Sequence, residues 1–458
     1  MNFKQFYLGC LSHASYYLGS DGEAAVIDPQ RDVQQYLDEA EANGQRIKYV
    51  IETHSHADFV SGHTELAART GAQIVYGERA ATAFPTLKVK DGDRLQVGNI
   101  ELSFIETPGH TPEGITVVAK DGDALGEPLK VFTGDTLFIG DVGRPDLVGS
   151  KGFTAEQMAG MLYDSLHDKL LRLPDEAEIY PAHGAGSLCG KSLSKETWST
   201  LGVQRKANYA LQSMSKDEFV RTVTASQSEV PAYFQQSAAR NLQGSPSLED
   251  IPKPQPLSGT DALSFDGVII DVRPNSVYGS GHIPNAVNIG LGGQFAVWAG
   301  SMIPIGTPIA IAAETQDQID EAVMRLARVG HDTAVGSILM KDFEGDRKIV
   351  EQVSVDEADQ VRRSGEKMQL IDVRRPAEFD GGHAAGAVNI PLDKLSAEIG
   401  RLDPSVPAYV ICQSGYRSSL ATSLLENAGF ETIYNVTGGT KAWMDAGLEA
   451  EAASAAAG

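Results

Sequence analysis

Short apolar runs alternate with helical segments along the first half of the chain. Residues 33–43 and 65–70 have the spacing of amphipathic helices, and Gly44 and Gly71 follow them as stop signals. Strands interleaved with helices predict an α/β domain. The apolar runs of strand length lie at residues 24–29, 47–51, 73–76, 100–105, 115–118 and 129–132.

Histidine and aspartate side chains recur where these apolar runs end. Loops at strand ends can aim side chains from several strands at one point. Imidazole and carboxylate groups are the usual protein ligands of zinc and iron, so the series predicts a metal site. The alternative is a polar loop whose histidines bond only to the backbone. In chain order the residues are His54, His56, Asp58, His110, Asp135 and His183.

These residues resemble the ligand series of the metallo-β-lactamase fold, over residues 1–243. The resemblance implies an αββα sandwich with the metal at its edge. Two-metal hydrolases of that superfamily carry a His-x-His-x-Asp-His motif, whereas here Phe59 follows Asp58 in place of the last histidine. One ligand of the second metal position is therefore missing, which argues against a two-metal hydrolytic site.

Within the superfamily, the chain resembles the persulfide dioxygenases, also called sulfur dioxygenases. That resemblance implies one Fe(II) per chain, held by His54, His110 and Asp135. Two histidines and one carboxylate form the facial triad that suits non-haem Fe(II) oxygenases, because it leaves positions open for substrate and O₂. The choice of iron over zinc rests on the resemblance and not on the spacing. The residues left to orient the ligands or the substrate are His56, Asp58 and His183.

The resemblance also implies the substrates. A low-molecular-weight thiol persulfide, of glutathione or an analogue, would be oxidised by O₂ to sulfite and the free thiol. Arg144, which follows the third ligand, could bind an anionic substrate with its bidentate fork or form a structural ion pair. Cys189, six residues past His183, could carry or shield a persulfide beside the metal, or simply be buried.

Composition narrows the classes of partner. The 458 residues carry a net charge of −23, which argues against nucleic acid or an anionic membrane as a partner. No apolar stretch approaches the length of a membrane span, and the first six residues show no secretory signal pattern. Three cysteines far apart predict a reducing compartment and a cytoplasmic protein. The assembly state stays open, with a homo-oligomer among the alternatives.

A linker and an internal repeat follow the first domain. Residues 244–259 contain four prolines, which is typical of a stiff linker. Behind it, residues 268–274 match 370–376, and residues 281–289 match 382–390, at a period of about one hundred residues. We therefore expect two α/β units, at 260–347 and 348–450, and a flexible tail at 451–458.

Both units resemble the rhodanese fold, and the second carries its catalytic loop. The apolar strand 408–411 is followed by the loop Cys412 to Arg417 and a helix at 418–428. A cysteine between a strand and a helix faces backbone N–H groups and the positive end of the helix dipole, and Arg417 adds a cation. These features favour the thiolate and then a persulfide anion. The resemblance implies that Cys412 and Arg417 transfer sulfane sulfur, with thiosulfate and sulfite among the reactants.

The first rhodanese copy lacks a cysteine and an arginine in the corresponding loop. When Gly330 is aligned with Gly429, Ala313 falls opposite Cys412. Two acids, Glu314 and Asp317, stand where a persulfide anion would need donors. We expect this copy to be inactive and to serve as a spacer or a docking surface.

The sequence as a whole predicts a persulfide dioxygenase fused to an inactive and then an active rhodanese, with a role in sulfide detoxification. Two alternatives remain. One is a zinc thioester hydrolase of the glyoxalase II type fused to a sulfurtransferase, which Phe59 argues against. The other is a non-catalytic carrier or adaptor, in which Cys412 only relays persulfide to a partner protein.

Overall fold

The computed structural model of the protein describes residues 1–122, 126–147, 152–225, 227 and 229–452. Contacts divide the chain into two compact units, with the main boundary between Ile251 and Pro252. The short segment Ala327–His331 groups with the first unit. Most of the predicted tail, residues 453–458, lies outside the described residues.

The first unit contains two mixed six-stranded sheets. In sheet order, the first holds β1 (Asn2–Leu8), β2 (His13–Ser20), β3 (Glu23–Ile27), β4 (Arg46–Ile51), β5 (Gln73–Gly77) and β6 (Leu87–Val89). The second holds β12 (Ser199–Thr200), β11 (Glu178–Pro181), β10 (Lys130–Gly134), β9 (Ile115–Asp121), β8 (Ile100–Glu106) and β7 (Arg94–Val97).

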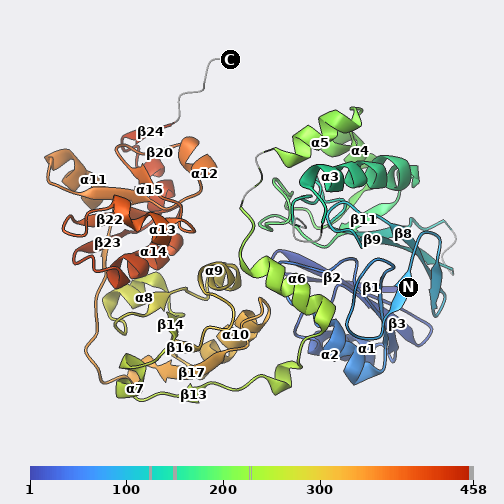
Figure 1. Cartoon of the computed structure of the whole chain (residues 1–458), viewed down its shortest axis with the longest axis horizontal. Helices are drawn as coiled ribbons and strands as arrows, with labels where there is room; N and C mark the ends of the chain where they lie inside the picture. The colour runs from blue at the N-terminus through green and yellow to red at the C-terminus, as the bar shows by residue number, and fades with distance from the viewer. Residues whose placement is uncertain (123–125, 148–151, 226, 228, 453–458) are drawn as a thin grey trace. The chain divides into compact units, whose positions relative to one another are not determined.

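Helices cover the outer face of each sheet, which gives the predicted αββα sandwich (Figure 1). Along β2, Tyr16 and Leu18 pack between the sheets, whereas Tyr17 packs toward α1 and α2. This alternation follows from the period of two along a strand. A third apolar cluster joins β9 and β10 to α3 and α5. The helices are α1 (Gln34–Ala42), α2 (His63–Thr70), α3 (Ala155–Asp164), α4 (Leu201–Ala207), α5 (Lys216–Thr224) and α6 (Tyr233–Gln243).

The second unit contains two five-stranded parallel sheets with the same strand order, which confirms the repeat. The first holds β13 (Gln255–Pro256), β17 (Ala334–Leu339), β16 (Ile309–Ala313), β14 (Val268–Asp271) and β15 (Val287–Asn288). The second holds β18 (Glu351–Val353), β23 (Ile433–Val436), β22 (Ala408–Ile411), β19 (Gln369–Asp372) and β21 (Val388–Asn389).

Helices pack on these sheets, and one apolar cluster runs through both copies. Ile311 of the first copy and Val410 of the second belong to that cluster, so the two copies share part of one core. The helices are α7 (Gly259–Leu263), α8 (Asn275–Ser280), α9 (Phe295–Met302), α10 (Gln316–Ala327), α11 (Val355–Ser364), α12 (Pro376–Asp380), α13 (Leu395–Glu398), α14 (Tyr416–Asn427) and α15 (Gly439–Asp445).

Two short strands lie where the sequence predicts irregular chain. Gln255 and Pro256, inside the expected linker, form β13 at the edge of the first rhodanese sheet, a position that tolerates proline. Glu451, the first residue of the expected tail, pairs with His383 through β24 (Ala450–Glu451) and β20 (His383–Ala384). Among the described residues, no helix is long and apolar enough to cross a membrane.

Candidate metal centre and cysteine site

Strand ends in the first unit bring His54, His110 and Asp135 together. One ligand atom from each lies within 4.8 Å of the other two, and each residue is at most 3% exposed. Oδ2 of Asp135 lies 3.3 Å from Nε2 of His110 and 3.7 Å from Nε2 of His54. His54 follows β4, His110 follows β8 and Asp135 follows β10. The three side chains at these strand ends therefore lie close together in the structure, as the sequence leads us to expect.

Hydrogen bonds on the far side of each ring fix the orientation of both histidines. Nδ1 of His54 lies 3.0 Å from Oγ1 of Thr53, which itself donates to Oδ2 of Asp28 at 2.9 Å. Nδ1 of His110 donates to the carbonyl oxygen of Arg144 at 2.9 Å. With Nδ1 as the donor, Nε2 of each ring keeps a free lone pair that points to Asp135.

The three side chains fit a metal ion. Burial lowers the pKa of His54 and of His110, so both rings are neutral donors near neutral pH. Neither carboxylate oxygen of Asp135, nor Nε2 of His54, has a hydrogen-bond partner among the described residues. Buried polar atoms without partners are costly, and a cation between them would satisfy all three.

A glycine makes this approach of strand ends feasible. Gly134, directly before Asp135, has φ of +51°, a left-handed conformation that other residues rarely adopt. A Cβ there would lie 2.5 Å from Oγ1 of Thr53 and 3.4 Å from Nδ1 of His54. A side chain at position 134 would therefore displace the strand end that carries His54.

His56, Asp58 and His183 form a second buried cluster beside the triad. Nε2 of His183 lies 3.4 Å from Oδ2 of Asp58 and 3.7 Å from Oδ1 of Asp135. Burial opposes the charged form of His183, but the Asp58 and Asp135 carboxylates outweigh it and raise the pKa of His183 to about 9. His183 is thus a buried cation that balances the two acids when no metal is bound.

One ring nitrogen of His56 points to two buried acids outside the triad. Its Nε2 lies 3.1 Å from Oδ1 of Asp28 and 3.6 Å from Oε2 of Glu52. Burial disfavours the charged ring, yet the Asp28 carboxylate prevails and raises the pKa of His56 to about 9. Burial also raises the pKa of Glu52, to about 8. His56 therefore links the metal loop to a buried acidic pair.

Phe59 fills the place of the missing histidine. Its ring is 1% exposed and lies 4.5 Å, centroid to centroid, from His56 and 4.1 Å from His13. His13 is fully buried, and neither of its ring nitrogens has a hydrogen-bond partner among the described residues. A phenyl ring offers no lone pair, so the first unit lacks a metal ligand at position 59.

Arg144 and Cys189 both lie beside the triad. Arg144 is in an ion pair, and Cys189 is a buried thiol. The Arg144 guanidinium donates two hydrogen bonds to Asp146, at 2.7 and 2.8 Å, and its backbone N–H donates to the Cys189 carbonyl. Sγ of Cys189 lies within 4.8 Å of ligand atoms of Asp135 and His183. Burial raises the pKa of the Cys189 thiol well above its usual value, which keeps it protonated.

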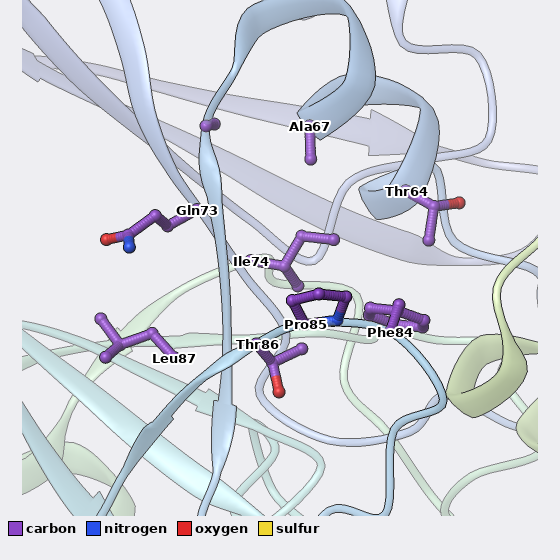
Figure 2. A pocket seen from close by; sticks show the side chains of 9 residues that line it. Thr64, Ala67, Gln73, Ile74, Phe84, Pro85, Thr86 and Leu87 are labelled. Atoms are coloured by element: carbon purple, nitrogen blue, oxygen red, sulfur yellow. The ribbon is translucent and has the colours of Figure 1, made fainter.

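A larger hollow elsewhere in the first unit carries no such chemistry. It has a volume of about 500 Å³ and lies between α2, β5 and the chain before β6 (Figure 2). Its lining has no titratable or nucleophilic side chain beyond two threonine hydroxyls, so the triad is the better candidate for a reaction centre. The lining residues are Thr64, Ala67, Ala72, Gln73, Ile74, Phe84, Pro85, Thr86 and Leu87.

Cys412 lies between β22 and α14 in the second unit, 1% exposed. The Gly415 N–H donates to its Sγ at 3.1 Å, and Oγ of Ser418 lies 3.5 Å from the same sulfur. Gly415 has φ of +103°, which turns its N–H back toward the sulfur. Arg417 forms two hydrogen bonds of 2.7 Å with Glu378, so this carboxylate already occupies its guanidinium fork.

The first rhodanese copy has kept the scaffold but not the nucleophile. Asp271 pairs with Ala312 across the sheet as Asp372 pairs with Ile411, so Ala313 occupies the place of Cys412. The Asp–Arg pair at the strand end is present in both copies, as Asp271–Arg273 and Asp372–Arg374.

Comparison with known proteins matches this division. The metallo-beta-lactamase superfamily model matches residues 8–183, and the rhodanese-like domain model matches residues 258–340 and 354–446. Persulfide dioxygenase ETHE1 of Bos taurus is 34% identical over 217 residues, which cover 46% of this chain and 75% of that protein. The chain belongs to the persulfide dioxygenase family. Two rhodanese-like domains follow this domain in the same chain. The combination supports a role in sulfur metabolism.

Other relatives share parts of the fold. The hydroxyacylglutathione hydrolase of Hahella chejuensis is 36% identical to this chain over 162 residues, which cover 35% of this chain and 57% of that protein. A solved metallo-beta-lactamase from Staphylococcus aureus subsp. aureus COL is 33% identical, with a TM-score of 0.68 over 74% of this chain and 99% of that chain. The superfamily and the buried donors together imply a bound metal ion.

Sequence reasoning about this persulfide dioxygenase homologue missed several residues at the site. Asp28 and Glu52 sit at strand ends, but neither lies in a spaced histidine motif. The Arg144 carbonyl acts through the backbone, which leaves no signal in side-chain type. His13 was detectable only as a histidine at the start of an apolar strand.

Proposed function

We propose that the first domain oxidises a low-molecular-weight thiol persulfide with O₂, giving sulfite and the free thiol, at one Fe(II). The reaction balances as RSSH + O₂ + H₂O → RSH + SO₃²⁻ + 2 H⁺. The observation that carries the proposal is the set of three converging donors, His54, His110 and Asp135, beside a second position where Phe59 has replaced a ligand. The identity to persulfide dioxygenase ETHE1 supports it.

The chain's own residues hold and tune this site. His54, His110 and Asp135 would bind Fe(II), which would supply open positions for the terminal sulfur and O₂. Thr53 and the Arg144 carbonyl keep the two imidazoles in the tautomer that a metal needs. His183, whose Nε2 lies 3.7 Å from Oδ1 of Asp135, could pair as a cation with a persulfide anion, and Cys189 would face the substrate as a neutral thiol.

The second rhodanese copy would transfer sulfane sulfur through Cys412. A Cys412 thiolate attacks the outer sulfur of thiosulfate, the sulfur–sulfur bond breaks, and sulfite leaves with the electron pair. The resulting persulfide then passes its outer sulfur to an acceptor thiolate. The Gly415 N–H and the start of α14 stabilise the negative sulfur in both steps. Sulfite is thus common to both halves.

The free cysteines support a proposal about the cellular setting. All three cysteines are free, which suits a reducing compartment, and we place the protein in the cytoplasm. Glutathione or a comparable thiol would be the persulfide carrier there.

A zinc thioester hydrolase is the second candidate, because a hydroxyacylglutathione hydrolase is 36% identical over part of the same domain. Both functions can be assayed on one preparation, with glutathione persulfide for O₂ uptake and S-lactoylglutathione for hydrolysis. We expect O₂ uptake with sulfite release and no thioester hydrolysis. Asp135→Asn should abolish uptake, whereas Asp164→Asn, at an exposed position on α3, should not change it. Hydrolysis without O₂ uptake would favour the second candidate.

A further inference from the structure

The loop that carries Cys412 is in direct contact with the inactive rhodanese copy. The Tyr416 hydroxyl donates to the carbonyl oxygen of Gly290 at 2.8 Å. Nδ2 of Asn275 lies 3.4 Å from the carbonyl oxygen of Gly415. Both contacts join the first copy to the segment that wraps around the cysteine. If the first copy served only as a spacer or as a remote docking surface, it would need neither of these two contacts.

Tyr416 packs against a short turn of the first copy, at residues 290–293. The ring packs so closely on Gly293 that a Cβ there would lie 2.6 Å from Cε2 and from Cζ of Tyr416. Gly292, one residue earlier, has nothing within 4 Å of its own Cβ position. Burial raises the pKa of Tyr416, so its hydroxyl keeps its proton and remains a donor.

Hydrogen bonds within the first copy fix the turn at residues 290–293. Arg325 on α10, 6% exposed, donates to the carbonyl oxygens of Leu291 at 2.6 Å and of Gly293 at 2.8 Å. The Leu291 N–H donates to the Val272 carbonyl beyond β14. The surface against which Tyr416 packs is therefore fixed to the sheet of the first copy.

Helix α14 transmits this contact to the sulfur. Tyr416 is its first residue, next to Gly415, whose N–H donates to Sγ of Cys412. Ser418, two residues on, lies 3.5 Å from the same sulfur. Because a helix moves as a unit, a shift of Tyr416 moves both groups relative to the sulfur. Farther along α14, Oγ of Ser419 donates to Oδ1 of Asn288 at 2.6 Å, and α14 also contacts α8 of the first copy (Figure 1).

We propose that the inactive copy positions the Cys412 loop, with Tyr416 as the positioning residue held by the Gly290 carbonyl and by Gly293. This deepens the proposed sulfur transfer and rests on it only in taking Cys412 as the reactive sulfur. The first copy has lost its own cysteine, while its 290–293 turn sets the geometry of the N–H and hydroxyl groups at the other copy's sulfur.

The test compares two neighbouring glycines in the full chain. Alkylation of Cys412 by iodoacetamide is followed by peptide-resolved mass spectrometry over a series of pH values. Gly293→Ala pushes on the Tyr416 ring, so we expect alkylation near neutral pH to slow about fivefold, the effect of weakening one hydrogen bond to a charged sulfur. The midpoint of the pH profile should move upward. Gly292→Ala, which meets no atom, should behave as wild type.

Further side-chain variants allow the same test if Gly293→Ala fails to fold. Tyr416→Phe removes only the hydroxyl and should shift the profile in the same direction. Thr333→Val removes a hydroxyl that donates to the Thr307 carbonyl at 2.6 Å within the first copy, and should not shift it. In a Tyr416→Ala background, Gly293→Ala should have no further effect.

Unchanged alkylation in both Gly293→Ala and Tyr416→Phe would overturn the positioning role. So would an undiminished effect of Gly293→Ala in the Tyr416→Ala background. Alkylation needs no sulfur donor, so its outcome is independent of the proposed transfer reaction. A wild-type chain that takes no sulfur from thiosulfate would refute that reaction while leaving the positioning measurable.

Discussion

The backbone carbonyl of Arg144 accepts a hydrogen bond of 2.9 Å from Nδ1 of His110. The position of that carbonyl depends on the guanidinium of the same residue, which is 1% exposed and bound to Asp146 and the Leu188 carbonyl. An ion pair at the edge of the site thus helps to orient His110, a candidate metal ligand. Arg144 therefore acts on the candidate metal site through its backbone carbonyl.

We expect Asp146→Asn to weaken metal binding. The substitution removes the charge opposite Arg144 and loosens the loop that orients His110. Loss of a group that supports a ligand lowers metal affinity by about 10–100-fold. Metal content after dialysis against a graded chelator measures this. The matched control is Asp164→Asn, which breaks an exposed pair with Lys216 and should leave metal retention unchanged. Equal retention in both variants would contradict the role of the Arg144 loop.

Phe59→His should restore a second metal position. The new imidazole would join Asp58, His183 and Asp135, which already converge, so metal content should rise from about one toward about two ions per chain. Phe59→Leu, which keeps an apolar side chain, should stay near one. Metal analysis on chains purified in parallel decides this. A wild-type chain that already binds two ions would show that Phe59 does not prevent a second site.

The metal-free chain should lose stability as pH rises from 6.5 to 9. The pKa of His183 is raised from 6.5 to about 9 in the folded state. The stabilisation is therefore complete below pH 6.5, where both states bind the proton, and is lost as pH approaches the folded value. The loss from His183 alone is at most about 3 kcal/mol. His56 shifts in the same direction, so the two effects add in sign.

Urea unfolding at pH 6, 7.5 and 9 in the presence of a chelator measures this dependence. Asp58→Asn removes a charge that raises the pKa of His183, so the pH dependence should become shallower in this variant. Constant or increasing stability across the same range in the wild type would show that His183 is not held as a cation.

Cys412→Ser should separate the two proposed activities. The substitution removes the sulfur that receives the N–H of Gly415, so sulfur transfer from thiosulfate to cyanide or a thiol should fall to background. O₂ uptake with a thiol persulfide should stay nearly intact, because the triad belongs to the other unit. An equally large loss of both activities would indicate that Cys412 takes part in the oxidation.

A metal site at these strand ends could be predicted because its signal is local, whereas the choice of three ligands among the six residues came from the resemblance to persulfide dioxygenases. His54, His110 and Asp135 each follow an apolar run, and the structure brings the end of β4 in the first sheet to the ends of β8 and β10 in the second. The repeat was likewise visible, since Asp271 and Asp372 sit in matching segments. The fold class followed from the same alternation of strands and helices.

Contacts between distant segments could not be predicted in the same way. The period along β2 shows which face His13 occupies, but Phe59 lies in the loop after β4, and nothing in either segment shows that the two rings pack together. The Tyr416–Gly290 bond joins two domains through a backbone carbonyl, which every residue has. The expected linker and tail were partly wrong because an edge strand needs only two residues and a neighbour, as β13 and β24 show.

The most direct test is metal analysis of the anaerobically purified chain followed by O₂ uptake on addition of glutathione persulfide. We expect about one iron per chain, with O₂ consumed and sulfite formed in equal amounts. About two zinc ions per chain, with no O₂ uptake, would contradict the dioxygenase and favour the hydrolase.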